Sequence, residues 1–432
     1  MKIAPNAAGV LAAVMTCALW VGSGSAGAAE GTSSVAGLGH FDHIFLVMME
    51  NHAYGQVIGN PSMPFFNSFA KSANLATNYF AVGHPSLTNY LEIVGGSNFG
   101  VRNDNSPNWH ASACAPGHVY LESDATSICP LAGVGLDAET PAIDTTNESP
   151  PNSTIDVDGI VGYPAASVTA KTIADQLVAN GRRWKAYEES LPPTGADGVN
   201  SADGLFSNLS LKSNGTTPAS STYVPTGQVF NGVVQGLYAV KHNPFAYFAA
   251  IQSGSDAKNS LNNMVGFDGA SGLFADLARG KVPDLAFIVP NQCNDQHGRS
   301  GSSSGPACDY DSTDNGTLTG LNPSLMYQGD ATLQRIVEAI KGSTAWTRGR
   351  NAIVVVWDEN DYSIAPTTNQ VALVVDASDG DHDGRSSSGS QSSRFYTSFS
   401  LLKSMEAAFD LPCLNHACDA NVPVMWDLFA AH

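Results

Sequence analysis

The sequence predicts an α/β fold, a three-layer α/β/α sandwich with a mostly parallel central sheet and long loop insertions. Runs of residues that are apolar at every position predict strands buried on both faces, which are typical of parallel sheets. The clearest runs are residues 43–49, 285–289 and 353–357. Helical patterns alternate with these strands, which favours a sheet covered by helices on both sides.

Weaker patterns complete the alternation. Further strands are expected at residues 184–187, 245–248 and 371–375. Helices are expected where apolar residues recur at helical spacing, at residues 64–73, 172–181, 330–341 and 400–409. Stretches rich in Ser, Gly, Asn, Asp and Pro lie between the elements, near residues 100–168, 190–229, 298–325 and 376–394. Because strand patterns resume after each stretch, we interpret them as insertions into a single domain, residues 30–432.

Residues 1–29 have the features of a secretory signal peptide. Lys2 precedes an apolar run at residues 10–21, and the small residues Ala26-Gly27-Ala28 follow as a cleavage site. This run is too short to span a bilayer, which takes roughly 20 apolar residues. No other segment of the sequence is long and apolar enough, so we expect a soluble protein, secreted or periplasmic, with no transmembrane segment.

Cysteine use agrees with export. The sequence has seven cysteines, and Cys17 lies in the predicted signal peptide, which leaves an even number for the mature chain. Paired cysteines in an exported chain predict disulfides. Chain proximity favours three short loops closed by Cys114–Cys129, Cys293–Cys308 and Cys413–Cys418, although other pairings stay open.

The net charge disfavours one class of partner. At pH 7 the formal charge is −19, so binding to nucleic-acid phosphates is not expected. Any anionic substrate would meet the same unfavourable field. We therefore expect a metal ion or a basic pocket wherever this chain binds an anion.

Polar residues gather where the predicted strands end. One cluster follows each of the three clearest strands: Glu50-Asn51, Asp295-x-His297 and Asp358-Glu359. The carboxyl ends of parallel strands meet at one edge of the sheet, where α/β proteins bind their ligands. Carboxylates that converge there repel one another unless they bind a cation. A single acidic pair is more often a helix cap or a solvated loop, but three such clusters favour a metal site.

A candidate nucleophile lies at the start of a short predicted helix. Ser86 follows Pro85 and is expected at the N-cap, where backbone N–H groups and the helix dipole favour a phosphate. A serine in that position can ionise beside a metal and attack phosphorus. Asn89, one turn further, can donate its amide to a phosphoryl oxygen. Serine is also among the commonest ordinary N-caps, so the surrounding clusters decide the interpretation.

Several segments carry these residues in a fixed order. They include IFLVMMENHAYGQVIG, GHPSLTNYLEIVGGSNFG, VKHNPFAYF, VPDLAFIVPNQCNDQHG and IVVVWDEND. Taken in this order, they resemble the phosphoesterase family of secreted acid phosphatases and bacterial phospholipases C, in the alkaline-phosphatase-like superfamily. The resemblance extends from about residue 41 to the C-terminus, interrupted by the loop stretches. It implies an alkaline-phosphatase-like sandwich and a hydrolase that acts on phosphoric ester bonds.

The resemblance also implies roles for particular residues. Ser86 matches the hydroxyl nucleophile, Asn89 a phosphate-contacting asparagine, and His84 a residue that steadies the phosphate. The metal-site residues that it implies are the polar clusters and the nucleophile: Glu50, Asn51, Ser86, Asp358, Glu359, Asp295 and His297. Of these, Asp295 and His297 would supply a second metal or a proton donor to the leaving group. The divalent ion itself stays open among Mg, Mn, Ca and Zn.

One position departs from the family pattern. Members usually carry a histidine before the late helix, and this chain has Ser398 there. A second metal site would lose an imidazole ligand unless His382 substitutes for it. The pair Lys241-His242, ahead of the strand expected at residues 245–248, is interpreted equally well as a cationic contact to an anionic substrate or as a loop.

These observations predict a metal-dependent phosphoesterase. The expected reaction is that of an acid-phosphatase-type phosphomonoesterase, with a serine nucleophile, a phosphoseryl intermediate and a small phosphate ester as substrate. The alternative is a phospholipase C or another phosphodiesterase, for which a phospholipid is the expected substrate. A non-catalytic relative that binds a metal or phosphate outside the cell is the third interpretation. The oligomeric state is not predicted.

Overall fold

The computed structural model describes residues 38–101, 104, 168–191, 237–298, 308–313, 315–361, 369–378 and 389–430, and the backbone of short strand pairs between these ranges. They belong to one compact unit, Ser34–His432. The expected signal peptide, most of the expected insertions, the Cys114–Cys129 pairing and His382 lie outside the described residues. Of the expected disulfides, Cys293–Cys308 and Cys413–Cys418 are confirmed.

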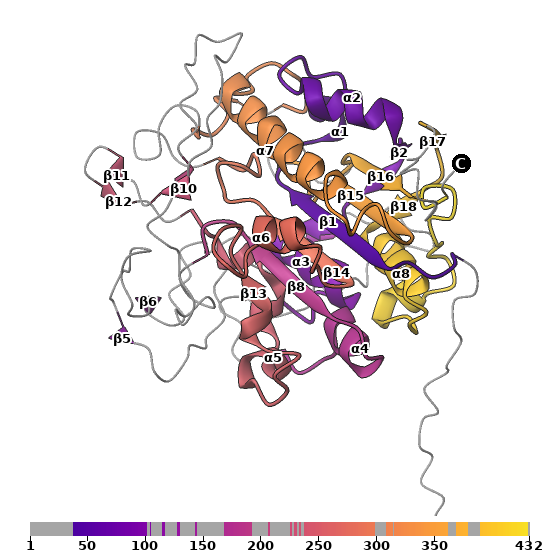
Figure 1. Ribbon diagram of the computed structural model, residues 1–432. Helices are drawn as coiled ribbons and strands as arrows, with labels where there is room; N and C mark the ends of the chain where they lie inside the picture. Colours follow the sequence, from indigo (N-terminus) through magenta and orange to yellow (C-terminus); the bar gives the residue numbers. More distant parts are fainter. Residues whose placement is uncertain are drawn as a thin grey trace, which may run out of the picture. The chain divides into compact units, whose positions relative to one another are not determined.

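An eight-stranded mixed sheet forms the centre of the unit (Figure 1). In spatial order its strands are β13 (Met264–Val265), β8 (Trp184–Glu188), β14 (Leu285–Val289), β1 (His43–Met49), β15 (Asn351–Trp357), β16 (Leu373–Ala377), β2 (Asn74–Ala76) and β17 (Gln391–Ser392). The first five run parallel, and β16 is antiparallel to both of its neighbours. The predicted mostly parallel sheet is therefore confirmed.

Short strands pair outside this sheet. They are β3 (Tyr79–Phe80) with β18 (Tyr396–Thr397), β4 (Gly83–His84) with β7 (Ile143–Asp144), β5 (Ala115–Pro116) with β6 (Ile128–Cys129), β9 (Phe206–Ser207) with β10 (Pro225–Thr226), and β11 (Val229–Phe230) with β12 (Val233–Val234). The β4–β7 pair lies next to the start of the helix that carries Ser86, because β4 ends two residues before it.

Helices form two layers (Figure 1). One layer holds α2 (Pro64–Ser72), α6 (Leu273–Arg279) and α7 (Pro323–Lys341). The other holds α3 (Ser86–Gly95), α4 (Ile173–Ala179), α5 (Ala249–Ser253), α8 (Ser398–Ala408) and the 3₁₀ turns η1 (Val240–His242) and η2 (Pro244–Tyr247). Short turns complete the described chain: α1 (Tyr54–Val57), η3 (Leu261–Asn263) and η6 (Asn415–Cys418). None of the described helices has the length and apolarity needed to cross a bilayer.

The strand register shows that the two layers cover opposite faces. Phe287 of β14 lies opposite Leu46, and Trp357 of β15 lies opposite Met49. Leu46 and Met49 are three residues apart on β1, so their side chains point to opposite faces. Accordingly, Phe287 packs on Tyr90 of α3, and Trp357 packs on Phe66 of α2. The three-layer α/β/α sandwich predicted from the sequence is confirmed.

Two predicted elements need correction. The strand expected at residues 245–248 is wrong, since Pro244–Tyr247 forms the 3₁₀ turn η2. A short run that is buried at every position does not distinguish a strand from a helical turn by periodicity. The helix expected at residues 330–341 begins earlier, at Pro323, because Asn322 caps it by accepting hydrogen bonds from the N–H groups of Ser324 and Leu325.

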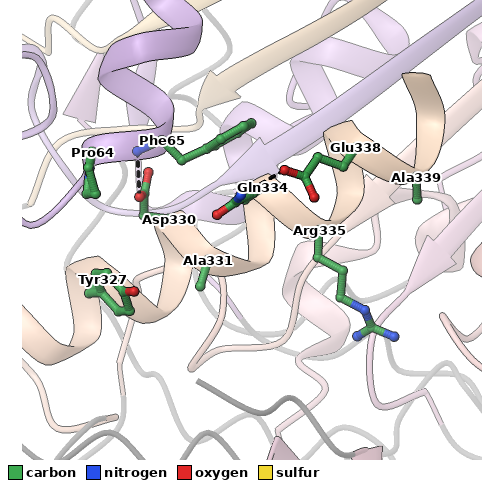
Figure 2. A pocket seen from close by; sticks show the side chains of 9 residues that line it. All are labelled: Pro64, Phe65, Tyr327, Asp330, Ala331, Gln334, Arg335, Glu338 and Ala339. Carbon is green, nitrogen blue, oxygen red and sulfur yellow. Dashed lines mark hydrogen bonds between the residues drawn. The ribbon is translucent and has the colours of Figure 1, made fainter. Parts of the chain in front are cut away.

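Asp330 links α7 to α2 through hydrogen bonds (Figure 2). Its carboxylate accepts hydrogen bonds from the backbone N–H groups of Phe65 at 2.9 Å and Phe66 at 2.7 Å, in the first turn of α2. It lies beside a groove of about 600 Å³ between the two helices. Burial raises the pKa of Asp330 to about 6, although the two N–H groups favour its charged form.

The protein is expected to lose stability as pH rises from about 4 to 7, because Asp330 must ionise in a buried place. Replacing Asp330 with asparagine should make this loss smaller. The folded-state pKa of Asp330 is raised, so its stabilising contribution is complete below the unfolded pKa of 3.8 and is lost as pH rises through about 6. Between about pH 4 and pH 7, the free energy of unfolding should fall by about 2–3 kcal/mol more in the wild type than in Asp330→Asn. Urea denaturation at both pH values measures this difference, and equal losses in the two proteins would contradict it.

Candidate active site

Acidic residues follow the central strands at the carboxyl edge of the sheet. β1 and β15 pair in register, with Met49 opposite Trp357, so the next residues, Glu50 and Asp358, lie side by side. The backbone holds this edge together: the N–H of Asp358 donates to the carbonyl of Met49, and the N–H of Glu50 donates to the carbonyl of Asp295, each at 2.9 Å. The structure thus brings the three predicted clusters to one place.

Ser86 lies at the centre of these clusters. Its Oγ is 3.2 Å from Glu50 Oε2 and 3.0 Å from Glu359 Oε1, and its side chain is buried. The expected N-cap position is wrong by one residue, because Pro85 is the N-cap and Ser86 is the first residue of α3. An N-cap hydroxyl would bond to the helix's own N–H groups, whereas the Ser86 hydroxyl contacts two carboxylates from other strands.

Glu359 is bound by His84 and Asn89, the two other residues that were expected around the nucleophile. Its Oε2 lies 2.9 Å from His84 Nδ1 and accepts a hydrogen bond of 3.0 Å from Asn89 Nδ2. Asn89 also bonds to the backbone of Gly83, both as donor and as acceptor. In this arrangement the Asn89 amide orients Glu359 and the chain before Ser86. The contact to phosphate that was expected from Asn89 stays a prediction.

Glu50 is bound on its other side by an aromatic pair. Tyr90 Oη donates a hydrogen bond of 2.6 Å to Glu50 Oε1, and His242 Nε2 lies 3.2 Å from the same oxygen. The rings of Tyr90 and His242 stack, with centroids 5.4 Å apart and planes 8° apart. His242 Nδ1 lies 3.3 Å from Asp295 Oδ2, so the imidazole bridges two of the predicted clusters.

His297 forms the outer wall of the site. Its backbone N–H donates to Asp295 Oδ1 at 2.7 Å, and its Nδ1 lies 3.0 Å from the carbonyl of Gly298. Because a carbonyl oxygen only accepts, Nδ1 carries the proton, and Nε2 presents its lone pair to Lys241 Nζ at 3.4 Å. Tyr310, which is 49% exposed, packs against the His297 ring.

The electrostatics of this cluster favour the addition of positive charge. Four of its carboxylates are buried: Glu50, Asp295, Asp358 and Glu359. Burial raises the pKa of each, and repulsion from Asp358 and Asp295 raises the pKa of Glu50 further. Burial acts to lower the pKa of His84, but the neighbouring Glu359 holds it above its ordinary value. A buried group of this kind ionises at neutral pH only at a cost, unless a cation compensates it.

The donors present fit a divalent cation. Ligand atoms of Glu50, His242 and His297 lie within 4.8 Å of one another. The Ser86 hydroxyl has one proton and can donate it to just one of its two carboxylate neighbours at a time. In addition, Asp358 Oδ2 is buried without a hydrogen-bond partner among the described residues. Carboxylate oxygens suit Mg, Mn or Ca, and imidazoles suit Zn.

Two residues of the sequence-based account lie less directly at this centre. Asn51 has a left-handed backbone (φ 62°), and its N–H donates to Asp358 Oδ1 at 3.1 Å, while its amide Nδ2 donates to Asp361 Oδ2 at 3.4 Å. Its role as a metal ligand stays a prediction. Ser398, at the start of α8, accepts a hydrogen bond from Tyr79 Oη. His242 and His297 supply imidazoles to the site independently of Ser398.

Sequence reasoning missed His242 and Tyr90 as members of the site. The basic pair Lys241-His242 was a visible signal, but a loop explained it equally well. Tyr90 follows Asn89 by one residue in an apolar helical pattern, which predicts a core position and gives no sign of the bond to Glu50. Glu189, after β8, accepts hydrogen bonds from Asn291 and Asn294 beside this site, and burial raises its pKa to about 7.

Curated proteins similar to this chain include three phosphatases. An acid phosphatase of Aspergillus fumigatus is 26% identical over 265 residues, which is 61% of this chain and 38% of the relative. A probable acid phosphatase of Kluyveromyces lactis is 23% identical, over 91% of this chain and 64% of its own length. A phosphatidylinositol-3-phosphatase of Mycobacterium tuberculosis is 22% identical, over 98% of this chain and 92% of its own length. The chain thus spans less than two thirds of either acid phosphatase.

A solved protein of the alkaline phosphatase superfamily from Vibrio parahaemolyticus covers 88% of this chain and 70% of its own, with 12% identity and a TM-score of 0.42. That score is too low to support a conclusion by itself. The Phosphoesterase family, in contrast, is matched over residues 60–308, more than half of the 432 residues. This match confirms the family that the sequence motifs indicated. The chain belongs to the Phosphoesterase family.

Proposed function

We propose that this protein is a metal-dependent phosphomonoesterase of the acid-phosphatase type, with Ser86 as its nucleophile. The position of the Ser86 hydroxyl carries the proposal, since it lies 3.2 Å from Glu50 and 3.0 Å from Glu359 in the first turn of α3. The names of the acid phosphatase relatives agree with it. Export to the periplasm or the exterior is part of the proposal and is supported by the N-terminal sequence.

A divalent cation would be held by Glu50, Asp358, Glu359 and Ser86, with the nearby imidazoles as further donors. When bound, it would favour ionisation of the serine and offset the charge of the substrate. This proposal is supported by the four buried carboxylates that converge here and by Asp358 Oδ2, which has no hydrogen-bond partner among the described residues.

The residues of the chain account for the remaining steps. Glu359 Oε1, whose pKa is raised, accepts the Ser86 proton as Oγ attacks phosphorus. The new Oγ–P bond replaces the P–O bond to the leaving alcohol, whose oxygen takes its proton from water, because Nε2 of His297 presents a lone pair to the site. Backbone N–H groups at the start of α3 stabilise the phosphoryl oxygens. Water then attacks the phosphoseryl group, which releases phosphate and restores Ser86.

A substrate panel with metal removal and add-back tests this function. After chelation, hydrolysis of p-nitrophenyl phosphate is expected to stop, and one or more of Mg, Mn, Ca and Zn should restore it. Phosphatidylcholine and bis(p-nitrophenyl) phosphate test the phosphodiesterase alternative in the same assay. Faster hydrolysis of either diester, or full activity after chelation, would contradict the proposal.

A further inference from the structure

We propose that Lys241 binds the phosphoryl group of the substrate and makes the site selective for dianionic phosphomonoesters over monoanionic diesters. This inference rests on the proposed function and names the substrate class of the same site. The sequence left Lys241 open between a substrate contact and a loop, and none of the metal or nucleophile roles described above uses it.

The position of Lys241 places its charge next to the nucleophile. Its Nζ lies 2.8 Å from Asp104 Oδ2, and Asp104 Oδ1 accepts a hydrogen bond of 3.0 Å from the N–H of Leu87. Leu87 directly follows Ser86 at the start of α3. The Asp104 carboxylate therefore connects the Lys241 ammonium to the N-terminus of α3, which faces the expected phosphate. Lys241 Nζ also lies 3.4 Å from His297 Nε2.

The Asp104 carboxylate occupies a position that suits a phosphoryl group. It is an anionic group held by an ammonium and by a backbone N–H at a helix N-terminus, which are the donors that proteins use to bind phosphate. Asp358 Oδ2, which is buried without a hydrogen-bond partner among the described residues, marks the neighbouring cation position, so the phosphoryl group would lie between that cation and the Lys241 ammonium. The site is thus arranged for a charged group that is bound from several sides.

The charge of Lys241 reaches the catalytic carboxylates. It lowers the pKa of Glu50, Asp295 and Glu359, against the stronger effect of burial. The side chain of Lys241 is only 12% exposed, so its interactions are screened less than those of a surface lysine. Among the described lysines and arginines, Lys241 is the one whose Nζ contacts both Asp104 and His297.

A fixed ammonium group distinguishes the two kinds of ester by their charge. At neutral pH a phosphomonoester carries close to two negative charges, and a diester carries one. The Coulomb attraction to Lys241 is proportional to that charge, so it favours the monoester. The surrounding carboxylates repel a dianion in the same proportion, so the preference for the monoester depends on the Lys241 ammonium acting together with the bound cation.

The test compares Lys241→Met, which keeps the length of the side chain, with Lys241→Arg, which keeps its charge. The substrates are p-nitrophenyl phosphate and bis(p-nitrophenyl) phosphate, which share one leaving group, so proton donation to it is the same for both. In Lys241→Met, kcat/KM for the monoester is expected to fall about 100-fold and for the diester about 5-fold or less. Lys241→Arg should keep the monoester-to-diester ratio within a few-fold of the wild type.

Lys281→Met serves as the matched control, because Lys281 is an exposed lysine that precedes β14 at the opposite edge of the sheet. It should leave both rates unchanged. A wild-type protein that hydrolyses neither ester would overturn the proposed function itself. If the wild type is active but Lys241→Met keeps its monoester-to-diester ratio of kcat/KM, only this inference is overturned. The same holds if the Met and Arg variants both lose activity equally on the two esters. If Lys241→Met does not fold, Lys241→Gln is measured in the same way, with thermal unfolding as the check.

Discussion

Replacing Ser86 with alanine is expected to lower kcat for p-nitrophenyl phosphate by at least about 1,000-fold. The variant lacks the only atom that the proposal allows to form a bond to phosphorus. Its fold should persist, because among the described residues the lost hydroxyl bonds to the two carboxylates Glu50 and Glu359 and takes no part in capping α3. Steady-state kinetics measures the loss, and mass spectrometry after an acid quench should find phosphate on Ser86 of the wild type.

Thr88→Ala is the matched control for this experiment. Thr88 is a buried hydroxyl residue in the same turn of α3, and its Oγ1 donates to the carbonyl of Pro85 at 2.7 Å. Its loss is expected to cost about 1 kcal/mol of stability and to change kcat by a few-fold at most. Retained activity in Ser86→Ala would contradict the assignment of Ser86 as the nucleophile. A loss of kcat in Thr88→Ala as large as in Ser86→Ala would contradict it as well.

Replacing Glu50 with glutamine is expected to stabilise the metal-free protein but to reduce the stability that the protein gains from binding the metal. In the metal-free protein at pH 7, the change removes one buried charge from a repelling cluster, so the free energy of unfolding should rise by about 1–3 kcal/mol. At a metal concentration of 1,000 times the dissociation constant, the free energy of unfolding of the wild type rises by about 4 kcal/mol. The variant should gain less, because it binds the ion more weakly. Its activity should fall by at least about 100-fold.

Glu406→Gln separates this effect from the general effect of a buried glutamate. Glu406 lies in α8, is fully buried, and has its pKa raised by burial, as Glu50 has. Its replacement should raise stability by a similar amount whether or not the metal is present, and it should leave activity intact. Denaturation of both variants with and without added metal gives the comparison. A Glu50→Gln protein that gains as much stability from the metal as the wild type does would contradict the proposed site.

Much of the fold followed from patterns that are local in the sequence. The runs at residues 43–49, 285–289 and 353–357 are apolar at every position because parallel strands here are covered on both faces, and the structure has strands at all three. Acidic residues after such strands converge because parallel neighbours end at the same edge. For this reason Glu50, Asp295 and Asp358 could be assigned to one place before the topology was known.

The same reasoning failed where a contact depends on chain segments that are distant in sequence. The aromatic run at residues 245–248 has the composition of a strand, but the sheet edge next to β8 is taken by β13, and the run packs as the turn η2. His242 precedes that turn and bridges Glu50 and Asp295. No pattern near His242 indicates these partners, because they lie on other strands.

By itself, the sequence determined the three central buried strands, several of the helices beside them, the acidic sheet edge and Ser86 as the candidate nucleophile, because each depends on residue type and near-neighbour spacing. Only the tertiary structure decided that Ser86 is the first residue of α3, that its hydroxyl faces Glu50 and Glu359, and that His242 and Lys241 join them. The physical reason is packing: the orientation of α3 and η1 on the sheet sets which buried polar groups meet, and burial makes their charges interact strongly.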